Sequence, residues 1–408
     1  MRGECAEFSL EEVCLGVFDC PHSTPKLSDS GPYMVRTQDI RGGYFDTSSA
    51  VHVGEEVYLE RTQKAEPAYG DLLFSREGTY FGDAAEVPKA TRVCLGQRMV
   101  LIRPNPDLIR AGYLRIQINS PLFQAMIMQY RDGTVAERLN LPVIRNLVVK
   151  LPPIKVQDYI IENVTCLEKK IEINRQMNTT LESMAQAMFK SWFVDFDPVI
   201  DNALAAGNSI PETLHARAET RKALGDKRKP LPEAIQKQFP YRFVFSEEMG
   251  WIPDGWSLGK LSDIAELKTE SVNPNKEPDK HWAHYSIPAF DDGKCPTLDL
   301  GETIKSGKYC VPATCILASK LNPQFPRIWM PDVEDEGIAI CSTEFMPFVP
   351  RNDNERGFLY AFLCSDVIQT EIANRVTGST GSRQRVKPKE IAELPILVVP
   401  QKTRGLLF

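Results

Sequence analysis

The stretch that decides the fold covers residues 154–196 and reads IKVQDYIIENVTCLEKKIEINRQMNTTLESMAQAMFKSWFVDF. Apolar residues recur along it at alternating steps of four and three, which is the spacing of a helix that packs along one face against another helix. No Gly or Pro interrupts the run, Pro152 and Pro153 precede it, and Pro198 closes it. At 1.5 Å per residue such a helix would be about 60 Å long. We therefore predict one long helix with a stripe that requires a partner helix.

The stripe contains two polar positions, Asn174 and Asn178. Polar residues in such a seam weaken it and are typically used to fix register and partner choice. The alternative is that both face solvent and the seam is shifted by one residue. The predicted helix-packing and partner positions are Val156, Ile160, Val164, Leu167, Ile171, Asn174, Asn178, Leu181, Ala185, Met188 and Trp192.

Composition limits the class of protein. A chain of 408 residues is too long for one ordinary domain, and 25% charged with 42% hydrophobic residues is typical of a soluble globular protein. No apolar run approaches the ~20 residues of a membrane span, and the N-terminus has no signal-peptide core. The ten cysteines show no CxxC spacing, which indicates reduced thiols and a cytoplasmic protein. The net charge of −6 argues against nucleic-acid binding over the whole surface, so any such binding would depend on local basic patches.

Sequence echoes on the two sides of the long helix indicate an internal duplication. Residues 8–13 are echoed by residues 256–261, residues 70–75 loosely by residues 313–318, and residues 138–144 by residues 385–391. Each echo is weak alone, but together they keep one order at nearly constant offset. The predicted layout is a first domain (1–150), the central helix (151–200), an extended connection with one short helix near 211–224 (201–249), a second domain (250–399) and the start of a second helix (400–408).

Within each domain, short β-branched runs alternate with Gly, Pro and Asp, and one helix follows them. The helices are expected at residues 109–131 and 355–376. Strands are expected at residues 50–53, 93–95, 99–102 and 338–341. The predicted fold class is α+β, with two similar globular domains separated by a long coiled-coil-type helix.

The sequence contains no recognisable catalytic motif. The segment from Gly301 to Lys308 has one residue too many for a phosphate-binding loop. His281 and His284 could share a helical face, but no Glu follows His281 as in zinc proteases, so a hydrogen-bonded His pair is favoured over a metal site. Asn322-Pro323-Gln324-Phe325 is interpreted as a turn. We predict no catalytic residue, no metal and no cofactor.

Basic, glycine-marked loops are the strongest candidates for a binding site. Residues 375–387 gather Arg and Lys around small residues, and residues 131–138 occupy the same place in the first domain. Glycine lets backbone amides approach phosphate, Arg can bind phosphate or guanine, and Gln can read adenine. Each loop alone could be a solvated connection, but their equivalent placement favours nucleic-acid contact. The predicted DNA-binding residues are Arg76, Thr79, Arg131, Gly133, Thr134, Arg138, Lys320, Gly378, Ser379, Thr380, Ser382, Arg383, Gln384, Arg385 and Lys387.

At this point the chain resembles the specificity subunit of type I restriction–modification systems. The likeness covers nearly the whole chain, and its most specific part is the run AMFKSWFVDFDP at residues 187–198. It is also carried by Leu151-Pro152-Pro153-Ile154 at the start of the helix, by Asn174, Asn178 and Leu181-Glu182 within it, and by Gly250-Trp251-Ile252-Pro253-Asp254-Gly255-Trp256.

The resemblance implies two target-recognition domains, each reading one half of a bipartite DNA site and held apart by antiparallel helices. It implies a non-catalytic subunit that positions methyltransferase and restriction subunits, which use S-adenosylmethionine, ATP and Mg. Phe189, Trp192, Phe193 and Phe196 are too many aromatics for one seam, so we expect them to dock a partner or to pack against a recognition domain.

The chain departs from the family pattern after Pro400, where a second long helix barely starts. We expect a chain that lacks most of this helix and whose stripe pairs with another chain. Two other classes remain open: a protein-assembly scaffold with duplicated binding domains, and a stand-alone enzyme, which the missing motifs disfavour.

Overall fold

The structure is a computed structural model that describes residues 6–78, 81–130, 138–225, 230–376 and 384–406. It divides into two compact units, Met1–Gln176 and Met177–Phe408. Among the helices it describes, none combines the length and hydropathy needed to cross a lipid bilayer.

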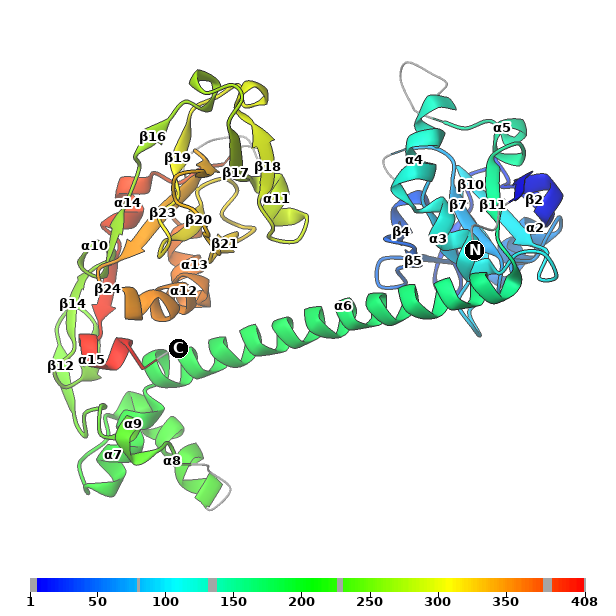
Figure 1. Cartoon of the computed structure of the whole chain (residues 1–408). Coiled ribbons are helices and arrows are strands. Elements are labelled where there is room, and N and C mark those ends of the chain that lie inside the picture. The colour runs from blue at the N-terminus through cyan, green and yellow to red at the C-terminus, as the bar shows by residue number, and fades with distance from the viewer. Residues whose placement is uncertain (1–5, 79–80, 131–137, 226–229, 377–383, 407–408) are drawn as a thin grey trace. The chain divides into compact units, whose positions relative to one another are not determined.

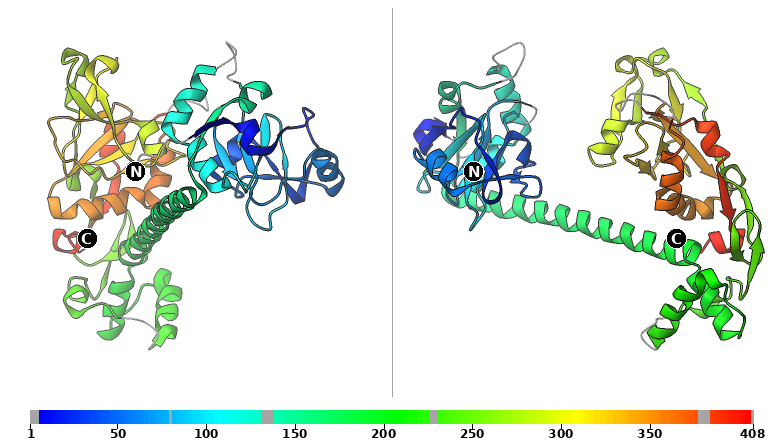
Figure 2. Two further views of the ribbon diagram at one scale, coloured as in Figure 1. Left: turned by 45° about the vertical axis from the view of Figure 1, so that its right-hand side comes forward. Right: turned by 180° about the vertical axis from the view of Figure 1, so that it is seen from behind.

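Helix α6 (Ile154–Phe189) is unbroken, as the absence of Gly and Pro predicts (Figure 1; seen from two other directions in Figure 2). It ends earlier than expected, in the π-helical turn η3 (Lys190–Val194). Phe196 then takes a left-handed φ of 55°, and helix α7 (Asp197–Ala205) begins with Pro198 in its first turn. Pro198 therefore opens the next helix, and the expectation that it closes the long one is wrong.

The core of the first unit is a four-stranded antiparallel sheet in the order β2-β10-β7-β8. Helices α3 (Ala111–Ile118) and α4 (Pro121–Ile127) pack on it through Leu114 and Phe123. The single helix predicted over 109–131 is thus two helices, because Ser120 caps the second one by accepting a hydrogen bond from the Phe123 amide at 3.3 Å. The strands are β2 (Cys14–Asp19), β10 (Met99–Pro104), β7 (Leu72–Ser75) and β8 (Ala84–Glu86).

A second, three-stranded sheet in the order β6-β3-β9 completes this unit. Strands β3 and β9 run parallel, and the first and last strands of the block, β1 and β11, pair antiparallel. The remaining elements are β1 (Ala6–Ser9), α1 (Leu10–Val13), β3 (Leu27–Val35), η1 (Thr37–Asp39), β4 (Ile40–Arg41), β5 (Tyr44–Phe45), β6 (Val51–Val53), α2 (Glu55–Thr62), β9 (Val93–Leu95), η2 (Met128–Tyr130), α5 (Leu141–Arg145) and β11 (Val148–Leu151).

The second unit repeats this plan, which confirms the predicted duplication. Its antiparallel sheet has the order β15-β23-β20-β21, strands β17 and β22 run parallel, and β14 pairs with β24 as β1 pairs with β11. Helices α12 (Arg356–Cys364) and α13 (Asp366–Ala373) replace the single helix predicted over 355–376, with Ser365 at the break. The strands are β14 (Ser257–Lys260), β15 (Ala265–Leu267), β17 (His281–Tyr285), β20 (Ile316–Ser319), β21 (Ile328–Trp329), β22 (Ala339–Ser342), β23 (Phe345–Pro350) and β24 (Pro395–Val398).

One sequence echo is out of register by one residue. Ser75 pairs with Met99 and Ser319 pairs with Phe345, so the two ladders match Ser75 with Ser319. The sequence comparison matched Ser75 with Ala318 instead. Such a shift exchanges the two faces of a strand, but all four residues of each strand are buried, so hydrophobicity alone could not fix the register.

The second unit has a further five-stranded sheet in the order β16-β19-β22-β17-β18. His281 and His284 lie on strand β17, so the expectation of a shared helical face is wrong; His284 Nδ1 lies 2.8 Å from Asp299 Oδ2. The other elements here are α10 (Leu261–Ile264), β16 (Ser271–Val272), η6 (Pro274–Lys276), α11 (Ile287–Asp291), β18 (Thr297–Leu300), η7 (Gly301–Thr303), β19 (Lys308–Cys310), η8 (Asp353–Glu355), α14 (Pro388–Ala392) and α15 (Gln401–Arg404).

The segment between the long helix and the second block is not extended, contrary to the prediction. It forms α7, η4 (Glu212–Leu214), α8 (His215–Leu224), α9 (Glu233–Gln236) and a hairpin of β12 (Phe243–Ser246) with β13 (Gly250–Pro253). Its apolar residues Ala218 and Phe239 join Trp192 in the core of the second unit. Burial of these residues stabilises the helices, although the Pro- and Lys-rich composition of the segment suggested an extended linker.

Candidate nucleic-acid interface

The first block brings two predicted cations to one corner of its sheet. Arg76 follows strand β7, its amide donates to the Arg98 carbonyl at 3.0 Å, and its carbonyl accepts from the Leu139 amide at 2.9 Å. Arg138 lies opposite Glu77 in an antiparallel bridge. We call this arrangement of Arg76, Arg98 and Arg138 the first basic corner.

The second block builds a corner with the same backbone pattern, in which Glu344 stands at the place of Arg98. The amide of Lys320 donates to the Glu344 carbonyl at 2.9 Å, its carbonyl accepts from the Val386 amide at 3.1 Å, and Arg385 lies opposite Leu321. Lys320 therefore corresponds to Arg76, and Arg385 to Arg138. We call Lys320, Gln384 and Arg385 the second basic corner.

A tight turn follows each corner. Gly78 has φ 97° and accepts from the Phe81 amide at 3.1 Å, while Asn322 has φ 48° and accepts from the Phe325 amide at 2.9 Å. Glycine and asparagine are the residues that most readily take this left-handed conformation. The interpretation of residues 322–325 as a turn is confirmed.

Acidic side chains pair with several predicted cations. Arg76 Nη1 lies 3.1 Å from Asp19 Oδ1. Arg385 donates through Nε and Nη2 to both oxygens of Glu344, at 3.0 Å each, and these hydrogen bonds raise its pKa further above the usual value. Lys387 Nζ donates to Glu390 at 2.7 Å. Because the Arg385 side chain is still 44% exposed, this pair contributes only about 0–1 kcal/mol, and phosphate can compete for the guanidinium.

Other predicted contact residues form fewer ion pairs within the described part of the chain, or lie outside the described ranges. Arg138 is exposed and Lys320 is half-buried, and within the described part of the chain neither has a carboxylate within ion-pair distance. Gln384 is half-buried, and its carbonyl accepts from the Asn322 amide at 2.8 Å. The predicted residues that lie outside the described ranges are Thr79, Arg131, Gly133, Thr134, Gly378, Ser379, Thr380, Ser382 and Arg383.

Sequence reasoning missed two cations beside these corners. Arg98 has a left-handed φ of 70°, and its Nε lies 3.2 Å from Glu77 Oε1. Arg327 supplies the carbonyl that accepts from the Ser319 amide at 2.9 Å, and it binds Asp291 through two hydrogen bonds of 2.7 and 2.9 Å. Arg98 could have been found, because it follows Gly96 between two predicted strands, where a loop tip is expected.

The predicted stripe of α6 is divided between two environments. Ile160 packs against the core of the first block, and Trp192 is buried in the core of the second unit, so neither is available to a partner helix. Val164 and Ala185 are half-buried. The exposed stripe positions are Val156, Leu167, Ile171, Asn174, Asn178, Leu181 and Met188, and the exposed apolar residues Ile173, Met177 and Met184, which the heptad pattern missed, widen the face.

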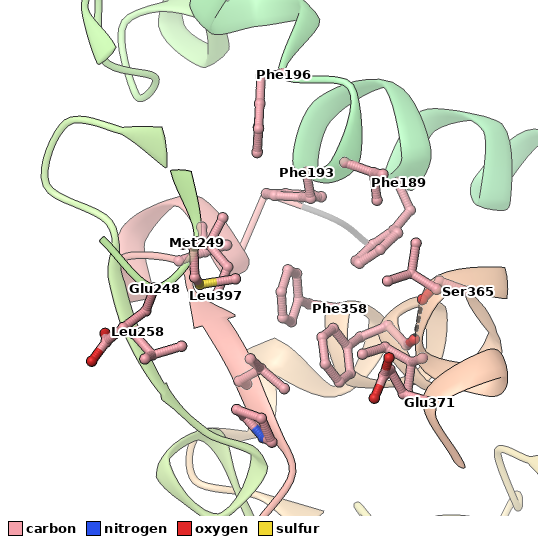
Figure 3. Close-up of a pocket in the computed structure, with 17 residues that line it drawn as sticks. Phe189, Phe193, Phe196, Glu248, Met249, Leu258, Phe358, Ser365, Glu371 and Leu397 are labelled. Carbon is pink, nitrogen blue, oxygen red and sulfur yellow. Dashed lines mark hydrogen bonds between the residues drawn. The ribbon is translucent and has the colours of Figure 1, made fainter. Parts of the chain in front are cut away.

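The aromatic residues at the end of the helix pack against the recognition block. The Phe193 ring lies 5.1 Å from Phe358 of α12 and 6.1 Å from Trp256. Figure 3 shows Phe189, Phe193 and Phe196 at one side of a largely apolar cavity of ≈ 530 Å³, with Phe358 and Leu397 across from them. Of the two roles expected for these aromatics, packing against the domain is the one observed.

The described residues offer no site for metal chemistry. No group of three or more His, Cys, Asp or Glu side chains among them is placed to hold a metal ion. The described cysteines, from Cys14 to Cys364, are free thiols.

Two blocks of one topology, each with Arg or Lys at the same strand end, stand before and after one long helix in the chain and define an internally duplicated protein. Over part of its length the chain is similar to the specificity subunits of type I restriction–modification systems. Residues 6–183 match the family model described as "Type I restriction modification DNA specificity domain".

Among individual proteins, the chain is similar to the HindI specificity subunit of Haemophilus influenzae, with 31% identity over 260 residues that make up 54% of each chain. It is also similar to the EcoBI specificity subunit of Escherichia coli, with 26% identity over 37% of this chain and 32% of that one. The chain thus spans about half the length of the curated relatives it matches.

Solved structures that align with the chain include the HsdS subunit of Thermoanaerobacter tengcongensis, with 13% identity, a TM-score of 0.35 and coverage of all of this chain and 88% of that one. Another is the type I restriction–modification S subunit of M. genitalium, with 12% identity, a TM-score of 0.43 and coverage of 100% and 89%.

Proposed function

We propose that this protein is the DNA-recognition subunit of a type I restriction–modification complex, in which each block reads one half of a two-part site. The observation that carries the proposal is the repeated basic corner, built from Arg76 and Arg138 in one block and from Lys320 and Arg385 in the other. Phosphate contacts by such cations fix the position of a protein on a duplex, while neighbouring side chains read the base edges.

The relatives named above are specificity subunits of type I restriction enzymes, and this supports a subunit that acts with others. We propose that the chain positions methyltransferase and restriction subunits on DNA in the cytoplasm and catalyses no reaction itself. In this proposal S-adenosylmethionine, ATP and Mg are used by those partners. The acidic total charge is compatible with DNA binding, because only the reading faces need Lys and Arg.

The direct test is to co-express the chain with its partner methyltransferase and to map methylated positions across a genome. We expect a motif of two short defined sequences separated by a gap of fixed length. A continuous motif, or methylation that does not depend on this chain, contradicts the proposal. If the methylated positions are the same with and without this chain, and the chain still assembles stably with the other subunits, the alternative of a protein-assembly scaffold is favoured.

Replacing Arg138 with glutamate should weaken DNA binding by about tenfold or more, because the change removes an attraction and adds a repulsion beside the phosphates. The slope of log affinity against log salt should fall by about one for each phosphate that the variant no longer neutralises. Binding of a pool of random duplexes, measured by anisotropy at several salt concentrations, checks this. Lys237→Glu, at an exposed position directly after α9 that belongs to neither corner, makes the same charge change and should bind like the wild type.

We also propose that the exposed face of α6 pairs with a second copy of the chain. Leu167, Ile171 and Leu181 lie on one face and are each more than half exposed, which is unusual for large apolar residues in a row. Sedimentation at micromolar concentration should show a dimer that Leu181→Glu dissociates. Ser183→Glu, on the other side of the helix, is the matched control. A monomeric wild-type chain contradicts this pairing.

A further inference from the structure

A clasp of three side chains holds the long helix to the first block. Arg115 of α3 donates through Nη1 and Nη2 to the two oxygens of Glu168 on α6, at 3.0 and 2.9 Å. The Tyr44 hydroxyl donates to Glu168 Oε2 at 2.5 Å, and the Arg115 guanidinium lies 5.0 Å from the centre of the Tyr44 ring. Each of the three residues thus contacts the other two. We call Arg115, Tyr44 and Glu168 the clasp.

The ion pair of the clasp is largely removed from solvent, whereas Tyr44, which covers it, is 51% exposed. The Arg115 side chain is 6% exposed and that of Glu168 is 24% exposed. Burial alone raises the pKa of Glu168, but the hydrogen bonds from Arg115 and Tyr44 outweigh it and hold the pKa below its usual value. Glu168 is therefore a carboxylate at neutral pH, and the bidentate geometry with Arg115 fixes its direction as well as its distance.

The surrounding backbone is shaped to bring Tyr44 to this position. Tyr44 follows Gly42 and Gly43 in the turn of the β4–β5 hairpin, and both glycines have positive φ. A Cβ at Gly43 would lie 2.6 Å from Arg115 Nη1. The turn therefore needs glycine both for its conformation and for the close approach of the guanidinium.

The second unit has a looser arrangement at the corresponding place. Glu182, about four turns further along α6, accepts from the Tyr360 hydroxyl of α12 at 3.4 Å and lies 3.4 Å from Lys294 Nζ. Helix α12 occupies in its block the place that α3 has in the first. Both contacts are longer than those of the clasp, and the charged side chains Glu182 and Lys294 are more exposed than Glu168 and Arg115.

We propose that the clasp is a positioning device that sets the direction in which α6 leaves the first block, and thereby the gap between the two half-sites. This inference rests on the proposed function. The half-site bases are read at the basic corners, whereas the distance between the readers depends on how each is held to the helix. Loosening the clasp should leave the bases unchanged and relax the gap.

The test is selection of DNA by the full chain from a pool of random duplexes, with wild type compared with Glu168→Gln. The substitution keeps the size of the side chain and removes the charge that Arg115 and Tyr44 bind. We expect the wild type to select two half-sites at one gap. We expect the variant to select the same half-sites with a several-fold larger share of neighbouring gap lengths.

The matched control is Asp158→Asn. Asp158 also joins α6 to α3, through an Arg110 contact of 3.0 Å, but it is exposed and outside the clasp. It should keep the single gap. A Glu168→Gln chain that keeps the wild-type gap overturns the inference, as does one that loses the first half-site altogether, because the residue then supports the fold of the block. A wild-type chain that selects no two-part site overturns the proposed function, and the inference with it.

Discussion

Replacing Asp197 with alanine is expected to destabilise the second unit by about 3 kcal/mol. The Asp197 side chain is only 4% exposed and lies at the start of α7. It accepts hydrogen bonds from Arg217 Nε and Nη2 at 2.8 and 2.7 Å and from Ser191 Oγ at 2.7 Å, and Arg221 Nη1 lies 3.3 Å away. The substitution removes the buried carboxylate that Arg217 and Arg221 share and leaves the Ser191 hydroxyl without this acceptor, while Arg217 keeps Asp195 and Arg221 keeps Asp201 as partners.

The effect should depend on pH. Burial raises the pKa of Asp197, but the hydrogen bonds of Arg217 and Ser191 and the charge of Arg221 outweigh it, so the pKa in the folded state is below its usual value. A carboxylate with a lowered folded-state pKa stabilises the protein above its unfolded-state pKa of about 3.9, and this contribution is lost as the pH falls through the folded-state value. The difference between wild type and Asp197→Asn should therefore shrink in acid.

Urea unfolding followed by tryptophan fluorescence measures this effect in the second unit alone, because all five tryptophans lie there, at positions 192, 251, 256, 282 and 329. Glu219→Ala on α8 is the control. That side chain is exposed and pairs with Lys222, so its loss should leave the unfolding midpoint close to that of the wild type. Equal midpoints for Asp197→Ala and Glu219→Ala would rule out a stabilising role for the buried carboxylate.

Phe193→Ala should also destabilise the second unit strongly, by about 3–5 kcal/mol, since removing a buried phenyl ring loses its transfer free energy and leaves a cavity. The ring is 6% exposed and contacts Phe189, Phe358 and Trp256. Met188→Ala is the comparison, because Met188 lies on the same helix but is exposed. The Met188 variant should unfold close to the wild type in the same fluorescence assay. If the two substitutions cost the same, the aromatic cluster does not act as a core.

The long helix and the duplication were predictable because both depend on local pattern. An uninterrupted heptad run forms a helix wherever a partner surface exists. Two blocks with the same strand order also keep their similar sequence segments in the same order along the chain. The end of the helix was not predictable in the same way. Pro198 is compatible with closing one helix or opening another, and the left-handed Phe196 that decides between them leaves no trace in the pattern.

The positions of the candidate site residues could be predicted from the sequence, but the acidic side chains that pair with them could not. Arg138 and Arg385 fall at matching corners, as their places in the repeat suggested. Glu344 and Asp19, which pair with Arg385 and Arg76, are distant from them in sequence. Ion pairing of this kind depends on tertiary placement, which no spacing rule captures. In the segment 201–249 the helix predicted near 211–224 is present as η4 and α8, whereas α9 was missed, because the few apolar residues of this segment gain their partners only in the folded core.

The pairing of first and last strands in each block has a practical consequence. Ser9 lies opposite Val148 in the first block, and Lys260 opposite Pro395 in the second, so each block enters and leaves at a single place. A segment whose ends meet can be exchanged for another of the same plan without rerouting the chain around it. Each block is therefore a segment whose two ends lie side by side. A chimera that is joined at these strand pairs should fold and have the DNA-sequence preference of the protein that donated the block.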